Sequence, residues 1–592
     1  MRNGICGAMT DPLVRLDSHD PRRGGRSFCF GGLDEVVAAS RVEEVIPALV
    51  RVEEAVSRGL HAAGYVAYEA APAFDSALRT HPADPRLPLL WFAIFAEREE
   101  VPAVRHHPGD AERFSLGEWS PIPGEGAYRL AVEEIRELIA AGDSYQVNHT
   151  LRLRAPFRGS DLALYRTLCA AQGAAYGAFL RLGDLTVVSA SPELFFRWTD
   201  GELELRPMKG TRPRGRWTAE DDALADELLT SPKERAENLM IVDLLRSDAG
   251  RVSCFGSVTV PRLFEVERYR TVHQLTSTVR SRTAPGTTLT DVFRALFPSG
   301  SVTGAPKVRT MGVIREMEET PRGIYTGAIG FVSPGEAEFS VAIRTLVVDT
   351  SAGRAELGVG SGITHDSNAA AEWEECLAKA RFTRHTRGDV ELLETLLHRP
   401  MQGYFLLDGH LARMEASARY FDLRYDEERV RAALARAVRG ARSLLRVRLV
   451  LAVDGDVLVR EEPLGNPPRS PLRVALSATP VDSRHALLYH KTTFREPYEA
   501  RRREHPEHDA VLLVNERGEI TEGDTANVVV MVAGELCTPP LEAGLLPGVF
   551  REHLLRAGTL RERTLLPADL HAAEEVYLVN SLRGWQRALL AE

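Results

Sequence analysis

Pro207-Met-Lys-Gly-Thr-Arg-Pro213 carries one of only five lysines among the 73 basic residues of this 592-residue chain. The other lysines are Lys233, Lys307, Lys379 and Lys491, and the remaining 68 basic residues are arginine. Arginine keeps its proton in proteins whereas lysine can lose it, so the few lysines are candidates for chemistry that needs a free amine. The alternative is that GC-rich codon usage left a few lysines by chance or for salt bridges.

The overall composition limits the class of protein. A chain of 592 residues exceeds what one hydrophobic core organises, so two or more globular units are expected. The net charge is −10, with no basic stripe, which argues against nucleic acid as the main partner. The N-terminus has no signal core and no apolar stretch is long enough to span a bilayer. We therefore expect a cytoplasmic protein with no membrane attachment.

The six cysteines are scattered along the chain and form no Cys-x-x-Cys pair. This pattern indicates neither a cysteine-based zinc site nor a disulfide framework. It fits a reducing compartment such as the cytoplasm.

Hydrophobic periodicity on both sides of Lys209 alternates between strands and helices. Long strands interleaved with helices indicate a layered α+β domain. The apolar patterns predict strands at 185–198, 271–280 and 339–348, and helices at 128–141, 234–245, 306–317 and 369–382.

A short charged stretch at 383–389 separates this pattern from a second one. The second pattern begins at Val390 and includes a strand turning into a helix at 406–420 and strands at 443–451 and 510–515. We place the boundary between 388 and 389, which predicts domains at 1–388 and 389–592.

Two pairs of glutamates lie three residues apart within predicted helices. Glu234 and Glu237 face one way from the first helix, and Glu372 and Glu375 face one way from the second. Such pairs are most often solvated surface. If the two faces converge, they suit Mg²⁺, which is held by few carboxylates together with water and an anionic substrate.

Residues 120–385 resemble the chorismate-utilising enzymes, a family that includes anthranilate synthase component I, isochorismate and salicylate synthases, and aminodeoxychorismate synthase component I. The resemblance implies a chorismate-binding domain of layered β-sheet and helices. The matching blocks, in family order, are Gly142-Asp-Ser-Tyr-Gln-Val-Asn148, Ser191-Pro-Glu193, Pro207 to Pro213, Lys233 to Leu244, Pro298-Ser-Gly-Ser-Val-Thr-Gly-Ala-Pro-Lys307, Tyr325-Thr-Gly-Ala-Ile-Gly330, and Gly360-Ser-Gly-Ile-Thr-His-Asp366 through Glu375.

Two positions choose among the activities of this family. Its water-using members resemble one another in carrying a lysine base where this chain has Gln146, so the resemblance implies ammonia as the nucleophile. Anthranilate synthases usually carry alanine where this chain has Lys209, whereas aminodeoxychorismate synthases usually carry lysine. A deprotonated lysine can add at C2 of chorismate before ammonia attacks C4, which an arginine cannot do. The resemblance therefore implies amination of chorismate at C4.

The resemblance also assigns the other residues of this site. Glu193 matches the general acid that protonates the departing hydroxyl. Glu237 and Glu375 match the Mg²⁺ ligands, with Glu234 and Glu372 contacting the ion through water. The implied substrate-binding residues are Gln146, His273 beside the ring, Thr303, and Tyr325, Arg344, Gly360, Ser361 and Gly362 around the substrate carboxylates.

The chain contains no Gly-x-Cys-x-Gly nucleophile of a glutamine amidotransferase. The ammonia then comes from solution or from a separate glutaminase subunit. We expect such a subunit as a partner.

Lys491 is the second lysine that its surroundings single out. It follows the apolar stretch Leu487-Leu-Tyr-His490, where burial would lower the pKa of its amine, as imine formation requires. A buried structural lysine is the alternative, although fully buried lysines are uncommon.

Residues 391–592 resemble the class IV (fold type IV) pyridoxal-phosphate enzymes, which include branched-chain and D-amino-acid aminotransferases and aminodeoxychorismate lyase. The resemblance implies that Lys491 forms the Schiff base with pyridoxal 5′-phosphate and that Glu522 pairs with its pyridine nitrogen. It places Arg413, the amides of Val549 and Phe550, and the hydroxyl of Ser581 on the phosphate, with Asn527 and Asn580 lining the site. The matching blocks are 392–396, 407–413, Lys491-Thr-Thr493, 519–527, 538–541, 544–549 and 575–581.

The residues of the second domain leave aminotransferase and lyase both open. The order of the domains favours the lyase, because aminodeoxychorismate is the product expected of the first domain and the substrate of that enzyme. We therefore predict a fused enzyme that makes 4-aminobenzoate and pyruvate from chorismate and ammonia for folate-type metabolism, with a possible homodimer formed through the second domain. The alternatives are a class IV amino-acid aminotransferase or a non-catalytic dimerisation or binding module in its place.

Overall fold

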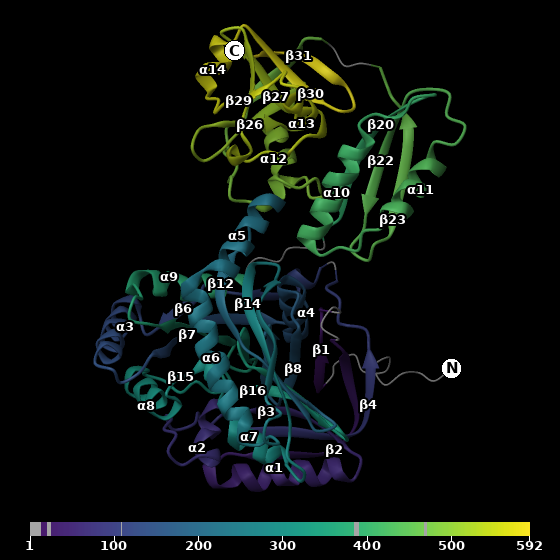
Figure 1. Ribbon diagram of the computed structural model, residues 1–592. Coiled ribbons are helices and arrows are strands. Elements are labelled where there is room, and N and C mark those ends of the chain that lie inside the picture. Colours follow the sequence, from purple (N-terminus) through teal and green to yellow (C-terminus); the bar gives the residue numbers. More distant parts are fainter. Residues whose placement is uncertain (1–12, 21–24, 108, 384–389, 467–469, 592) are drawn as a thin grey trace. The chain divides into compact units, whose positions relative to one another are not determined.

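The chain divides into two compact units (Figure 1). The first comprises Met1–Pro213 and Ala225–Gly388, and the second comprises Arg214–Leu224 and Asp389–Glu592. The domain boundary expected between 388 and 389 falls at the edge of a range outside the described residues. The computed structural model describes residues 13–20, 25–107, 109–383, 390–466 and 470–591.

The first unit is built mainly of strands. They are β1 Val14–Asp17, β2 Ser27–Ala39, β3 His61–Val66, β4 Leu90–Val101, β5 Phe114–Leu116, β6 Ser120–Ile122, β7 Gln146–Gly159, β8 Tyr176–Leu182, β9 Leu185–Ser191, β10 Leu194–Thr199, β11 Glu202–Arg206, β12 Met208–Pro213, β13 Thr259–Arg268, β14 Val272–Arg282, β15 Gly304–Ala305, β16 Ala328–Ser333, β17 Glu336–Val341, β18 Thr345–Asp349 and β19 Arg354–Ile363. Its α-helices are α1 Val42–Ser57, α2 Ala71–Phe74, α3 Glu125–Ala140, α4 Asp161–Gln172, α6 Pro232–Gly250, α7 Leu289–Leu296, α8 Lys307–Met317 and α9 Ala369–Ala380. Helix α5 Thr218–Thr230 begins in the segment Arg214–Leu224 of the second unit and ends in the first.

Antiparallel pairing links these strands into one curved sheet system. One run passes through β14, β11, β10, β17, β16, β3, β4 and β2, and continues through β1, β8, β9, β18, β19 and β7. One hydrophobic core contains no helix residues and includes Phe28, Tyr65, Trp91 and Phe331. Two further cores combine strands with helices, α1, α6 and α7 in one and α3, α4, α8 and α9 in the other. This arrangement is the layered α+β architecture that the sequence predicts.

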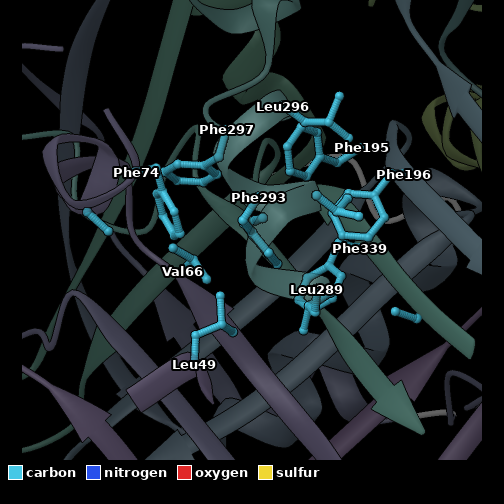
Figure 2. Packing of buried hydrophobic residues seen from close by; sticks show 14 of the residues in the cluster. Leu49, Val66, Phe74, Phe195, Phe196, Leu289, Phe293, Leu296, Phe297 and Phe339 are labelled. Atoms are coloured by element: carbon cyan, nitrogen blue, oxygen red, sulfur yellow. The ribbon is translucent and has the colours of Figure 1, made fainter. Parts of the chain in front are cut away.

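An aromatic cluster holds α7 against the sheet (Figure 2). The ring of Phe293 on α7 lies edge-on to Phe339, at 5.1 Å between centroids, and to Phe196, at 5.5 Å. Such pairs add about 0.5–1.5 kcal/mol each beyond the area they bury. Thr288 begins α7 with a capping box to Asp291. Because α6 contributes Ile241 to the same core, the cluster also fixes the helix that carries Glu234 and Glu237.

Two strands that the sequence predicts as continuous are interrupted. The segment 185–198 forms β9 and β10 with a break at Pro192–Glu193, and the segment 339–348 forms the end of β17 and the start of β18 with a break at 342–344. Proline has no N–H for the ladder, and Arg344 has a left-handed backbone with φ 53°. The helices predicted at 128–141, 234–245, 306–317 and 369–382 are confirmed as α3, α6, α8 and α9.

The second unit contains two sheets. The four-stranded sheet consists of β20 Leu392–Arg399, β21 Gly403–Tyr404, β22 Leu445–Leu451 and β23 Val457–Pro463. The eight-stranded sheet consists of β24 Leu472–Leu476, β25 Ala510–Val514, β26 Ile520–Gly523, β27 Asn527–Val532, β28 Glu535–Thr538, β29 Arg561–Glu562, β30 Glu575–Asn580 and β31 Gly584–Leu590. The helices are α10 Leu407–Phe421, α11 Glu427–Ala437, α12 Glu496–Glu504, α13 Val549–Arg556 and α14 Pro567–Ala572.

The second unit also takes in Arg214–Leu224, a segment from the middle of the sequence range expected for the first domain. The hydroxyl of Tyr420 donates to the carbonyl oxygen of Gly215 at 2.7 Å. The rings of Trp217 and Tyr489 lie 5.1 Å apart between centroids. The sequence pattern gave no indication of this excursion.

Candidate active sites

A cavity of about 510 Å³ in the first unit collects most of the residues predicted for the first site. Its lining comes from β12, β19, α6 and α9 and from the breaks between β9 and β10 and between β17 and β18. The predicted residues that line it are Glu193, Lys209, Glu234, Glu237, Tyr325, Arg344, Gly360, Gly362, Glu372 and Glu375.

Lys209 enters this cavity from a bulge in β12. The register against β14 shifts between Met208 and Thr211, and Gly210 has φ +99°, which a residue with a side chain rarely adopts. A bulge of this kind re-aims the neighbouring side chain. Burial lowers the pKa of the Lys209 amine, although nearby carboxylates, chiefly that of Glu237, act against this effect. A larger fraction of the amine is therefore uncharged than in water.

Gln146 lies beside Lys209. A methyl group built on Gly362 would fall 2.4 Å from Lys209 Nζ and 2.2 Å from Gln146 Nε2, so the two side-chain ends meet next to that glycine. The side chain of Gln146 is fully buried, and neither its amide nitrogen nor its oxygen has a hydrogen-bond partner within the described chain. A buried amide without a partner is costly, so Gln146 and the neighbouring Lys209 are suited to bind a small polar molecule.

Glu193 is placed to donate a proton. Its Oε1 accepts a hydrogen bond of 2.6 Å from the hydroxyl of Ser301, and its carboxylate also accepts a backbone hydrogen bond from Met208. Burial raises the pKa of Glu193 to about 7, against the smaller effect of Ser301 and Lys209. A carboxylic acid with this pKa is still partly protonated at neutral pH, as general acid catalysis requires.

Carboxylates from α6 and α9 face the same cavity. Ser231 caps the start of α6, and Asn368 caps the start of α9, which sets the faces that carry the paired glutamates. Glu234 and Glu375 have cationic partners in Arg212 at 2.9 Å and Lys379 at 2.7 Å.

Glu237 is the glutamate of this group whose carboxylate would gain most from a nearby cation. Burial raises its pKa, the charges of Lys209 and Lys233 act against this effect, and the carboxylates of Glu234 and Glu372 add to it. A divalent cation among these side chains would offset that repulsion, so the residues present fit Mg²⁺ chemically.

Arg344 and Lys379 form a cationic region of the lining. The guanidinium of Arg344 donates to the carbonyl oxygen of Lys379 at 3.0 Å, and burial lowers its pKa to about 10. Lys379 also donates to the carbonyl oxygen of Gly360 at 2.8 Å. A substrate carboxylate here would repay the cost of burying the guanidinium.

Four predicted substrate-binding residues do not line the cavity, and one of them is the fully buried Gln146. His273 is fully buried in β14, and its neighbour Gln274 lines the cavity instead. Thr303 uses its hydroxyl to donate to the carbonyl oxygen of Ser299 at 3.0 Å. Ser361 lies between Gly360 and Gly362 on β19, so its side chain points to the opposite face, where its hydroxyl is 3.0 Å from that of Tyr128.

Sequence reasoning missed Lys233 and Lys379 as cavity residues, although both line it together with Lys209. The scarcity of lysine could have indicated them, since three of the five lysines in the chain line this one cavity. Lys307 differs from them, because it pairs with Asp248 at 2.8 Å.

Lys491 is the centre of a second group of predicted residues, in the second unit. It lies between a 3₁₀ turn at Ala486–Leu488 and α12, and its carbonyl oxygen accepts from the N–H of Leu393 on β20 at 2.9 Å. Burial, and then the charge of Arg413, lower the pKa of the Lys491 amine to about 8. This shift favours the neutral amine that imine formation needs.

Glu522 on β26 is held by three donors. Its Oε1 accepts from the hydroxyl of Tyr498 and from the N–H of Leu546, both at 2.9 Å, and its Oε2 accepts from Asn527 at 3.2 Å. Burial raises the pKa of Glu522 to about 7. A protonated pyridine nitrogen beside this carboxylate would restore its charge, so Glu522 fits the predicted role chemically.

Arg413 connects this group to the start of α13. It donates to both carboxylate oxygens of Glu394, at 2.8 and 2.7 Å, and to the carbonyl oxygen of Pro547 at 3.0 Å. Pro547 lies two residues before Val549, where α13 begins, and a helix N-terminus with an arginine suits a phosphate. Asn580, in contrast, uses its side-chain oxygen on the N–H groups of Leu582 and Arg583. Ser581 is buried next to it.

Residues 14–385 match the chorismate binding enzymes, and residues 391–590 match the class IV amino-transferases. The first match covers more than half of the chain, so the chain belongs to the chorismate binding enzymes, with a class IV amino-transferase domain after them. In the described residues no helix is long and apolar enough to cross a membrane.

Three known proteins show the similarity in detail. Aminodeoxychorismate synthase of Streptomyces pristinaespiralis is 49% identical over 258 residues, covering 43% of this chain and 36% of that protein. Aminodeoxychorismate synthase component 1 of Klebsiella aerogenes is 40% identical over 304 residues, covering 51% of this chain and 64% of that protein. The structure of anthranilate synthase component I from Streptococcus pneumoniae matches with a TM-score of 0.53 at 28% identity, over 61% of this chain and 92% of that one. This chain thus spans 36% and 64% of the length of the two curated relatives.

Proposed function

We propose that the first unit aminates chorismate at C4 to give 4-amino-4-deoxychorismate, and that the second unit eliminates pyruvate to give 4-aminobenzoate. The observation that carries the first step is the half-buried Lys209, which shares its cavity with Glu193 and meets Gln146 at Gly362. The names of the aminodeoxychorismate synthase relatives support the same reaction.

The amination proceeds through two displacements in this proposal. The Lys209 amine adds at C2 of the ring while Glu193 protonates the C4 hydroxyl, which leaves as water. Ammonia then attacks C4 and the Lys209 amine leaves C2, so one hydroxyl is exchanged for one amine. Gln146 holds the incoming ammonia, since its amide oxygen has no other partner within the described chain.

Mg²⁺ is the ion proposed for the carboxylates of the first unit. Glu237 and Glu375 would hold it, with Glu234 and Glu372 around it through water, and the ion would balance the charge of a substrate carboxylate there. Arg344 binds the other substrate carboxylate in this proposal.

Pyridoxal 5′-phosphate is the cofactor that the class IV match implies for the second unit. When bound, it stabilises negative charge at the substrate carbon that bears the amine. Lys491 takes the proton from that carbon, the bond from C3 to the enolpyruvyl oxygen breaks, and protonation of the departing group gives pyruvate as the ring becomes aromatic. Glu522 keeps the pyridine nitrogen protonated, and Arg413, the start of α13 and Ser581 hold the phosphate.

An amino-acid aminotransferase is the second candidate for this unit, because the family that matches it is that of the class IV amino-transferases. The two candidates require the same lysine and the same carboxylate. They differ in product, since only the lyase releases pyruvate from aminodeoxychorismate without a second keto acid.

We also propose the setting of the enzyme. A separate glutamine amidotransferase supplies the ammonia, which agrees with the name component 1 of the Klebsiella relative. The second unit forms a homodimer, and the protein works in the cytoplasm.

Product analysis of the purified chain tests the proposal. With chorismate, Mg²⁺ and ammonium at high pH, it should form 4-aminobenzoate and pyruvate in equal amounts, whereas glutamine should replace ammonium only after a separate amidotransferase is added. Lys209→Ala should stop amination but leave supplied aminodeoxychorismate a substrate. Formation of anthranilate, or full amination by Lys209→Ala, would refute the first half of the proposal.

A further inference from the structure

The turn between α12 and β25 brings together three side chains that bind metals. His505, Glu507 and His508 each offer a ligand atom within 4.8 Å of the other two, and no other group of three His, Cys, Asp or Glu in the described chain has this geometry. The turn lies in the second unit, and none of its residues belongs to either site described above. The cysteine pattern gives no hint of it, because its ligands are imidazole and carboxylate.

The ligand atoms of this group lie close together. Glu507 Oε1 lies 2.7 Å from His508 Nδ1 and 4.0 Å from His505 Nδ1, and the two imidazole rings lie 5.6 Å apart between centroids. His505 Nε2 is buried without a hydrogen bond in the described chain, whereas His508 Nδ1 is buried with the carboxylate of Glu507 beside it. An unsatisfied buried nitrogen is costly, and a metal ion is one partner that would satisfy it.

The backbone of the turn is fixed before any ion binds. Pro506 restricts the chain after His505, and the N–H of His508 donates to the carbonyl oxygen of His505 at 3.3 Å. Arg473 on β24 donates to the carbonyl oxygen of Glu507 at 2.7 Å. A fixed turn lowers the entropy that the ligands lose on binding.

We propose that His505, Glu507 and His508 form a site for a borderline divalent ion of the Zn²⁺ class, with water in the remaining position. Two imidazoles and one carboxylate suit Zn²⁺, Ni²⁺ or Cu²⁺, whereas Mg²⁺ prefers oxygen ligands alone. The side chain of Glu507 is 61% exposed, which gives the ion a path from solvent.

The position of the turn implies a consequence for the second unit. It follows α12 directly, and α12 carries Tyr498, whose hydroxyl donates to Glu522. An ion bound at the turn ties the C-terminal end of α12 to the start of β25. Because the ion binds the folded state, loading should raise the unfolding temperature of the second unit.

Equilibrium dialysis of the full chain against Zn²⁺, in excess Mg²⁺ to occupy the carboxylates of the first unit, tests the proposal. The unchanged chain should retain one more equivalent of Zn²⁺ than His505→Ala or His508→Ala. His571→Ala is the matched control, because His571 is exposed on α14 of the same unit and outside the turn. Co²⁺ should give visible absorption bands of four-coordinate geometry in the unchanged chain and the control only.

Glu507→Gln separates loss of a ligand from loss of the fold, because the side chain is largely exposed. Its affinity for Zn²⁺ should fall by more than about tenfold, the loss that removing even an outer partner of a metal ligand causes. The rise in unfolding temperature on adding Zn²⁺ should be lost in all three turn variants and kept in His571→Ala. Equal Zn²⁺ retention by the unchanged chain and the turn variants would overturn the proposal, as would the absence of that equivalent in the unchanged chain.

Discussion

The absence of a side chain at Gly362 leaves the space in which the ends of Lys209 and Gln146 lie. A Cβ at this position would fall within 2.4 Å of Lys209 Nζ and within 2.2 Å of Gln146 Nε2. Both are ends of flexible side chains, so Gly362→Ala should fold but push the amine and the amide away from their places. We expect a large loss of synthase activity, with conversion of supplied aminodeoxychorismate unchanged.

Gly312→Ala is the matched control for Gly362→Ala. Gly312 lies within α8, and a Cβ there would meet no atom within 4 Å. Alanine should stabilise that helix by up to about 1 kcal/mol and leave the rate of chorismate amination unchanged. If Gly362→Ala aminates chorismate as fast as this control, the positions of the Lys209 amine and the Gln146 amide beside Gly362 are not needed for amination.

The protonation of Glu193 should govern the pH dependence of the amination. Its pKa is raised by burial to about 7, and the general acid is the protonated form, so the active fraction falls as the pH rises through about 7. Because deprotonation of Lys209 increases the rate with pH, the rate of amination at a constant concentration of free ammonia should stop rising as the pH passes about 7. Glu193→Gln should be slower by roughly 10²–10⁴-fold and should lose this pH dependence. A rate that keeps rising with pH above 7 in the unchanged chain, as it should in Glu193→Gln, would show that Glu193 is not the acid.

For single residues, the sequence predicts which side chains can take part in a reaction better than it predicts which side chains touch one another. The scarcity of lysine singled out Lys209 and Lys491, which lie half-buried in separate groups of polar residues. Lys379 went unnoticed although its i,i+4 pairing with Glu375 on α9 can be read from the sequence, because its carbonyl acceptor Gly360 reaches it only in the fold. Ser361 was expected on the cavity by its block, but strand alternation turns its side chain away.

Interruptions of the strands, more than the strands themselves, build the first cavity. Glu193 follows the end of β9, and Arg344 stands between β17 and β18. Alternating apolar residues predicted the strands on both sides of each break. They did not predict the break at Arg344, because its left-handed backbone at φ 53° is imposed by the surrounding fold on a residue that does not favour it.

Two substitutions at Arg344 separate the backbone role from the side-chain role. Both Arg344→Gly and Arg344→Ala remove the guanidinium, so the KM for chorismate should rise about 10–150-fold, the range expected for a lost hydrogen bond to a charged group. Glycine adopts the left-handed conformation freely, so Arg344→Gly should be more stable than Arg344→Ala by about 1–2 kcal/mol. Chorismate kinetics and urea unfolding of the first unit measure the two effects. An unchanged KM in both variants would exclude Arg344 from substrate binding.

The whole molecule joins two kinds of chemistry in one chain. The motifs that indicate each of them lie in separate ranges of the sequence, so sequence reasoning separated the two without a structure. The assignment of Arg214–Leu224 to the second unit was beyond its reach, because the contact of Trp217 with Tyr489 joins positions far apart in the chain. The order of the proposed reactions is likewise a property of the whole chain, since the product of one unit is the substrate of the other.

Removing the second lysine should therefore divide the overall reaction at its intermediate. Lys491→Ala loses the amine that binds the cofactor and moves the proton, while the first cavity is untouched. This variant should consume chorismate and ammonia at the normal rate but accumulate aminodeoxychorismate, which chromatography distinguishes from 4-aminobenzoate. Adding an independent aminodeoxychorismate lyase should restore the product, whereas adding the same lyase to Lys209→Ala should not. If Lys491→Ala alone makes 4-aminobenzoate at the normal rate, the second unit is not the lyase, and the aminotransferase becomes the better explanation of its fold.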